Sequence, residues 1–176
     1  MYTRTLAAIF GKNIAIEINK KFSSNIKSVD DENPLIDFKS IRGYGGTAIL
    51  WQKDLNNTVN IMPDGNSRIQ VITINSSPIA TCLINTYMPS AQSSGDIEYK
   101  DTLDQISEIM DKYRETYQII LCGDMNASLH RDNRKRDTVF GEFKNINNLH
   151  IPDGYPIKPN FFHHNGKYTS QIDYFL

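Results

Sequence analysis

Residues 118–126 read Gln-Ile-Ile-Leu-Cys-Gly-Asp-Met-Asn, and this stretch decides the fold class. The apolar run within it is typical of a central strand that is covered on both faces. Two polar side chains, Asp124 and Asn126, follow at once, and residues two apart on extended backbone face the same way. The crevice outside the carboxyl ends of strands is the usual ligand site of α/β sheets. The stretch therefore predicts a strand that delivers a carboxylate and an amide to such a crevice.

The segments on either side of this strand have helical spacing. Apolar residues recur every three or four positions over 97–114, which predicts an amphipathic helix, and a weaker pattern predicts a second helix over 137–148. Residues 2–21 indicate a further helix, and the polar stretch 22–45 is expected to be a long loop of the kind that often carries function. The apolar positions of the first pattern are Leu103, Ile106, Ile109, Met110 and Tyr113.

The remaining segments favour strands. Alternation of apolar and polar residues is typical of half-buried strands, and Pro, Gly and Asn mark the turns between them. The upstream strands are expected to form a mainly antiparallel meander. Together with the helices, they indicate an α/β layered sandwich in one domain. Strands are expected at 47–51, 58–62, 68–74, 79–87, 160–163 and 168–176, with turns at 63–66 and 164–167.

Composition excludes several classes of protein. Among 176 residues, 19 Lys and Arg stand against 20 Asp and Glu, so the net charge of −1 argues against a general coating of DNA, which needs many phosphate contacts. The two cysteines, Cys82 and Cys122, lie in apolar runs and are expected to be buried free thiols. No apolar run approaches the roughly 18 residues of a membrane span, and the early apolar segment is too short for a signal peptide. An intracellular protein is expected.

Several polar residues have a structural interpretation beside a functional one. Asp173 lies among apolar neighbours, and a carboxylate in a buried strand needs a partner. His163 and His164 are expected to point to opposite faces of a strand, which disfavours one shared metal ion. The basic run at 131–136 is expected to be a solvated loop, with contact to nucleic acid as the alternative. Asn85 and Tyr87 lie at a strand end that Pro89 terminates.

Five motifs occur in one order along the chain. They are Arg-Gly-x-Gly-Gly-x-Ala-Ile-Leu-Trp (42–51), Asp-Gly-Asn-x-Arg-Ile (64–69), Asn-x-Tyr-Met-Pro (85–89), Gly-Asp-x-Asn (123–126) and Ser-x-Ile-Asp-Tyr-Phe-Leu (170–176). This set resembles the endonuclease/exonuclease/phosphatase family, with the greatest similarity to the endonuclease domain of non-LTR (LINE-type) retrotransposons. The resemblance covers about residues 25–176.

The resemblance implies a four-layered α/β sandwich of the DNase I type. It also implies hydrolysis of phosphodiester bonds with Mg²⁺ or Mn²⁺, and a monomer that nicks DNA beside an associated reverse transcriptase, in the nucleus or cytoplasm and away from membranes. Phosphoryl transfer needs a placed water and charge neutralisation at the phosphorus, which agrees with this residue set.

The roles of individual residues also follow from the resemblance. Asp124 would orient or deprotonate the attacking water and contribute to the metal site, and Asn126 would hold that water. Tyr87 would hydrogen-bond the scissile phosphate, and Asp173 would orient a catalytic histidine. The expected substrate-binding residues are Asn85, Asn160 and Ser170.

The sequence departs from the family pattern at both ends. The metal-binding Glu of a Leu-Gln-Glu motif has no match, since Glu17 lies in a different context, and the Ser-Asp-His motif would lie beyond Leu176. Neither His163 nor His164 matches it. We therefore expect one partial domain over 1–176, incomplete at both termini, with impaired activity. The alternatives are a phosphatase of the same fold that acts on a small phosphoester, and a non-catalytic remnant or binding fragment.

Overall fold

The computed structural model describes residues 20–27, 46–90, 95–131, 134–164 and 166–176. Nine strands and two α-helices lie in these ranges, with a short 3-10 helix, η2, at Lys53–Leu55. The strands are β1 (Phe22–Lys27), β2 (Thr47–Gln52), β3 (Val59–Asn66), β4 (Ile69–Ile74), β5 (Thr81–Tyr87), β6 (Gln118–Asp124), β7 (Phe161–Phe162), β8 (Thr169–Ser170) and β9 (Asp173–Phe175), and the helices are α3 (Asp96–Tyr113) and α4 (Lys135–Ile146).

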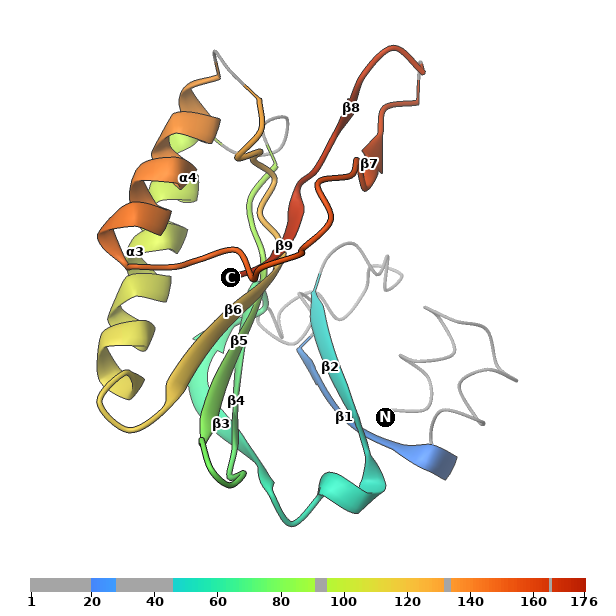
Figure 1. Cartoon of the computed structure of the whole chain (residues 1–176), viewed down its shortest axis with the longest axis vertical. Helices are drawn as coiled ribbons and strands as arrows, with labels where there is room; N and C mark the ends of the chain where they lie inside the picture. The colour runs from blue at the N-terminus through green and yellow to red at the C-terminus, as the bar shows by residue number, and fades with distance from the viewer. Residues whose placement is uncertain (1–19, 28–45, 91–94, 132–133, 165) are drawn as a thin grey trace, which may run out of the picture.

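The central sheet has five strands in the order β3-β4-β5-β6-β9. Strands β3, β4 and β5 form the predicted antiparallel meander, β5 and β6 are parallel, and β9 is antiparallel to β6. Helices α3 and α4 lie against one face of this sheet, and the two-stranded sheet β1–β2 faces the other (Figure 1). The α/β sandwich is confirmed, with helix, sheet and sheet as the layers of the described ranges.

Each face of the central sheet has its own apolar core. The larger core lies between the sheet and the helices, because α3 turns its apolar face inward as its 3.6-residue spacing predicts. The smaller core joins the two sheets and includes Ile49 of β2 and Ile72 of β4. The larger core contains Val71, Ile84, Tyr99, Leu103, Ile106, Met110, Leu121, Phe140 and Tyr174.

Both cysteines are buried and free, as predicted. Cys82 belongs to the larger core, and Cys122 lies on β6. Burial raises the pKa of each thiol to about 11. Both thiols therefore stay protonated near neutral pH and act as small apolar side chains.

Two predicted segments in this part of the chain differ in the structure, and a third is not tested. The predicted loop at 22–45 begins with a strand, β1, because Phe22–Lys27 pairs with β2 over its whole length despite its polar sequence. The turn predicted at 63–66 lies inside β3, which continues through a register shift between Ile61 and Gly65. The chain reverses just afterwards, where Asn66 Oδ1 accepts from the backbone N–H groups of Arg68 and Ile69. The helix predicted over 2–21 lies almost wholly outside the described residues.

The predicted final strand, 168–176, is divided in two. Residues Thr169–Ser170 pair with β7 in a separate hairpin, and Asp173–Phe175 joins the central sheet beside β6. The hairpin β7–β8 extends away from the body of the molecule (Figure 1). None of the helices in the described ranges is long and apolar enough to cross a membrane.

Candidate active site

Three neighbouring strands bring Tyr87, Asp124 and Asp173 to the same level. Tyr87 pairs with Asp124 across the parallel strands β5 and β6, and Asp124 pairs with Asp173 across β6 and β9. Residues paired in this way point to the same face of a sheet. We call these three residues the strand-end row. Tyr87 and Asp124 are half-buried and Asp173 is exposed, so the row is open to solvent at its β9 end.

Asp124 and Asn126 meet through a turn and not through extended backbone. Asn126 has φ 48°, in the left-handed region, so the predicted extended geometry is wrong. Its backbone N–H donates to Asp124 Oδ1 at 2.8 Å, and its side-chain Nδ2 donates to the carbonyl of Met88 at 2.7 Å. Asparagine tolerates this backbone conformation better than most residues. The turn therefore fixes one oxygen of the Asp124 carboxylate.

The electrostatics of the row centre on Asp124. Burial raises the pKa of Asp124 to about 6, the backbone hydrogen bond from Asn126 opposes this rise, and the negative charge of Asp173 adds to it. Partial desolvation also raises the pKa of Asp173, although much of that residue is exposed. A carboxyl group that titrates near neutral pH is suited to accept and return a proton.

The donor set of the row suits a hard cation. Mg²⁺ takes oxygen ligands, keeps several waters and is bound through one or two carboxylates together with substrate phosphates. Asp124 and Asp173 provide two such carboxylates. Their negative charges repel each other, and a bound cation would neutralise that repulsion. No group of three or more His, Cys, Asp or Glu residues lies together in the described ranges. The two carboxylates of the row therefore fit Mg²⁺ as part of a ligand set.

The environment of Asp173 differs from the prediction of a buried carboxylate, because it lies on the exposed side of β9 while the next residue, Tyr174, faces the core. Asn160 holds the start of β9. Its Oδ1 accepts from Ile172 N at 2.8 Å and from Asp173 N at 3.3 Å, and its Nδ2 donates to the Asp173 carbonyl at 3.0 Å. The side chain of Asn160 thus braces Asp173, and its contact with substrate stays a prediction.

Asn85 lies on β5, the strand of Tyr87, and Ser170 lies on β8, just before β9 in the chain. Asn85 Nδ2 is 3.5 Å from the carbonyl of Ala48, so this side chain connects β5 to the second sheet. Ser170 is half-buried, and its carbonyl accepts from Asn160 N at 3.1 Å. Ser170 lines a hollow of about 230 Å³ together with Arg131 and Lys158. The substrate-binding roles of Asn85 and Ser170 stay predictions.

The basic run is not a solvated loop throughout. Arg131 Nε and Nη2 donate to the two oxygens of Asp137 at 2.6 and 2.8 Å, and Asp137 also accepts from the backbone of Ser128. Arg136 is buried on α4 and donates to the carbonyl of Pro89 at 2.6 Å. Both arginines therefore hold the loops that follow β5 and β6. Lys135 is exposed and pairs with Asp96.

His163 and His164 lie together, against the prediction that they face opposite ways. Their ring centroids are 4.1 Å apart with an interplanar angle of 36°. Both residues follow the end of β7, where the chain turns, so the alternation of a strand does not apply to them. They belong to the projecting hairpin and not to the strand-end row.

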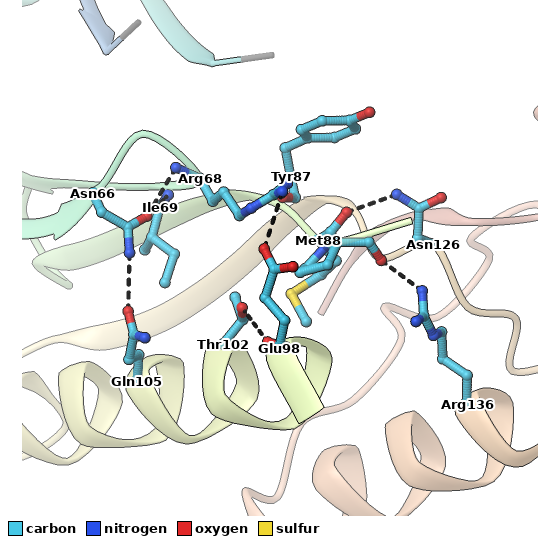
Figure 2. Close-up of polar contacts among 11 residues, drawn as sticks. Asn66, Arg68, Ile69, Tyr87, Met88, Glu98, Thr102, Gln105, Asn126 and Arg136 are labelled. Carbon is cyan, nitrogen blue, oxygen red and sulfur yellow. Dashed lines mark hydrogen bonds and ion pairs between the residues drawn. The ribbon is translucent and has the colours of Figure 1, made fainter. Parts of the chain in front are cut away.

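Sequence reasoning missed a cation beside Tyr87. The Arg68 guanidinium lies 5.9 Å from the centroid of the Tyr87 ring, and its Nη2 forms an ion pair with Glu98 at 3.1 Å (Figure 2). The backbone N–H of Tyr87 also donates to the Arg68 carbonyl. The Asp-Gly-Asn-x-Arg-Ile motif contained this residue, but the motif alone did not indicate which strand end it would reach.

Solved structures of other proteins share this fold. The endonuclease domain of TRAS1, a telomere-specific non-LTR retrotransposon, matches at a TM-score of 0.61 with 16% identity over 99% of this chain and 78% of that domain. The 3′ phosphatase NExo from Neisseria, bound to product DNA hairpin, matches at 0.56 with 14% identity over 91% and 68%. The human nocturnin catalytic domain with bound sulfate matches at 0.51 with 13% identity over 95% and 64%.

These similarities show that the chain has the DNase I-like fold of endonucleases, exonucleases and phosphatases. No family model matches the sequence, and no curated protein matches it. At identities of 13–16%, these similarities show the fold alone, and the activity has to be argued from the chemistry of the site.

Proposed function

We propose that this chain carries a phosphodiesterase site that nicks DNA with the help of a divalent cation. The observation that carries the proposal is the strand-end row, in which a tyrosine and two carboxylates lie level at the ends of three adjacent strands. The exposed Asp173 leaves the row open to a long substrate. The fold shared with TRAS1 and NExo supports the same reaction class.

The residues of the site divide the reaction among them. Asp124, fixed by the Asn126 N–H, orients the attacking water and accepts its proton. The Tyr87 hydroxyl donates a hydrogen bond to a phosphate oxygen, and the Asn126 amide holds the water. In this proposal Asp173 is a metal ligand, and its role in orienting a histidine stays a prediction. Mg²⁺ held by Asp124 and Asp173 would supply charge neutralisation at the phosphate.

Saturating Mg²⁺ is expected to lower the pKa of Asp124 from about 6 to a value below about 5, because a bound cation favours the ionised carboxylate. The measurement is an NMR titration of the Asp124 carboxyl carbon with and without Mg²⁺. The matched control is Asp64, whose carboxylate is already bound by Lys112 and Tyr113 and should not respond. An Asp124 titration curve that Mg²⁺ leaves unchanged would contradict the cation site.

The activity test uses supercoiled plasmid with protein in excess and Mg²⁺, followed over hours so that one nick per plasmid is detected. We expect slow nicking in proportion to protein, which EDTA stops and which the Asp124→Asn variant lacks. Equal nicking by the variant would show that Asp124 has no such role. Absence of nicking, together with absence of turnover of the substrates below, would reject the enzymatic function and favour the remnant.

A second candidate is removal of a terminal or small phosphoester phosphate, favoured by the shared fold with the 3′ phosphatase NExo. The discriminating substrates are an oligonucleotide with a 3′ phosphate and p-nitrophenyl phosphate. Faster turnover of either substrate than of plasmid, with the same loss in Asp124→Asn, would replace the nicking proposal by this one.

A further inference from the structure

Two chain segments carry the site beyond the strand ends. Residues 87–89 begin at the last residue of β5 and residues 124–126 at the last residue of β6, and we call them the Tyr87 segment and the Asp124 segment. They are bonded directly, because Met88 N donates to the Asp124 carbonyl at 2.8 Å and Asn126 Nδ2 donates to the Met88 carbonyl. Figure 2 shows Asn126 reaching Met88 on one side of this junction.

One side chain from each helix reaches these segments from the core side. The Tyr99 hydroxyl of α3 donates to the Met125 carbonyl at 3.0 Å, in the Asp124 segment. Arg136 Nη1 of α4 donates to the Pro89 carbonyl at 2.6 Å, in the Tyr87 segment, and Figure 2 shows the Arg136 side chain extending from its helix toward the strand ends. Each segment is thus bonded to a different helix.

The two side chains also contact each other. The Arg136 guanidinium carbon lies 4.5 Å from the centroid of the Tyr99 ring, a cation–π geometry, and the residues are 9% and 1% exposed. Burial raises the pKa of Tyr99, and the nearby Arg136 charge opposes that rise. The hydroxyl therefore keeps its proton and remains a donor near neutral pH.

A buried guanidinium contributes little net stability, because removing its charge from water costs free energy. Its ion-pair partner Asp96 lies 3.8 Å away, is half-exposed and also pairs with Lys135. Well-packed apolar side chains often match or exceed a buried ion pair in stabilising a core. The hydrogen bond that Arg136 donates to the Pro89 carbonyl therefore explains the buried arginine better than a gain in stability does.

We propose that Tyr99 and Arg136 are positioning residues that fix the spacing between Tyr87 and the Asp124–Asn126 turn. They close a ring of contacts that runs from the Tyr87 segment through Arg136 and Tyr99 to the Asp124 segment and back through Met88. The expected effect of these residues on kcat rests on the proposed function, whereas their effect on the position of the two segments does not.

The primary test is native-state amide hydrogen exchange, which needs no activity. In Tyr99→Phe and in Arg136→Met, the amides of Met88 and Asn126 are expected to exchange about tenfold faster or more, as local opening becomes easier, while amides of β4 are unchanged. Arg136→Lys should recover part of the protection, because an ammonium can still donate to Pro89. Arg114→Met, at the end of α3, is the control that changes neither amide.

Two results would overturn the proposal. Faster exchange at β4 to the same degree as at Met88 would show a loss of global stability and no local role. Unchanged exchange at Met88 and Asn126 would show that the ring of contacts does not hold them.

The secondary test applies if the activity assay succeeds. Each single variant is expected to lower kcat about tenfold with KM unchanged. The kcat of the double variant should be no lower than that of the less active single variant, because the effects of groups that act as a unit are not additive. Unchanged kcat with altered exchange would keep the positional role and remove the catalytic one. Failure of the wild type to nick leaves the exchange test intact, so the two proposals fail separately.

Discussion

The Asp124→Asn variant is expected to lose at least about a thousandfold in phosphodiester hydrolysis and, at the same time, to unfold less readily than the wild type at pH 7. The activity falls because an amide cannot accept the proton of the attacking water. The Asn126 N–H keeps its acceptor, since the side-chain oxygen of asparagine can replace Asp124 Oδ1. The local geometry is therefore preserved while the charge is removed.

The stability gain follows from the raised pKa of Asp124. Its ionised form is disfavoured in the folded protein, so the cost is complete above the folded pKa of about 6 and absent below the ordinary value of 3.8. The stability of the wild type therefore falls as pH rises between about 4 and 6. We expect the variant to gain about 1 to 2 kcal/mol at pH 7 and nothing at pH 3.5.

Urea unfolding of both proteins at pH 7, 5 and 3.5, in the presence of EDTA, measures this difference. Asp104→Asn, an exposed carboxylate on α3, is the matched control and should show no comparable gain. A variant that is less stable than the wild type at pH 7 would show that the Asp124 charge is well compensated in the fold.

The Gly123→Ala variant is expected to lose about 3 to 5 kcal/mol of unfolding free energy, enough to unfold a marginal domain. Gly123 has φ 125°, which side-chain-bearing residues rarely adopt. A Cβ there would lie 1.9 Å from the Thr86 carbonyl oxygen, in the backbone of β5. Strands β5 and β6 would have to separate, which removes Asp124 from its place beside Tyr87.

The matched control is Gly141→Ala in α4, where an added Cβ meets no atom within 4 Å. This change is expected to stabilise the protein by about 0.5 to 1 kcal/mol, because alanine favours helix more than glycine does. Urea midpoints of the two variants should therefore move in opposite directions. A Gly123→Ala midpoint close to that of the wild type would contradict the close approach of the two strands.

The elements that sequence could predict are those with a strong local pattern. Helix α3, strand β4 and strand β6 follow from periodicity and from an apolar run. Strand β1 could not be predicted, because Phe22–Lys27 is polar and its pairing with β2 is a tertiary contact. The division of 168–176 into β8 and β9 depends in the same way on which neighbour each half meets.

The candidate site shows the same limit. The rule that polar residues gather at strand ends indicated Asp124 and Tyr87, but the level pairing of Asp124 with Asp173 needed the register of β9. Arg136 lies in a charged run of the kind that is usually exposed on the surface of a protein. The burial of Tyr99 could have been predicted from the sequence, since Tyr99 lies four positions before Leu103 and thus on the same face of α3.

The parallel pairing of β5 and β6 has a consequence for the order of folding. Hairpins such as β3–β4 and β4–β5 close short loops, whereas the bond between Asn126 and Met88 joins residues 38 positions apart, and that between Leu129 and Tyr174 spans 45. Loop-closure entropy makes such long-range pairings slow to form. The meander can therefore assemble before the site does, and recovery of activity on refolding would follow the late, high-contact-order steps.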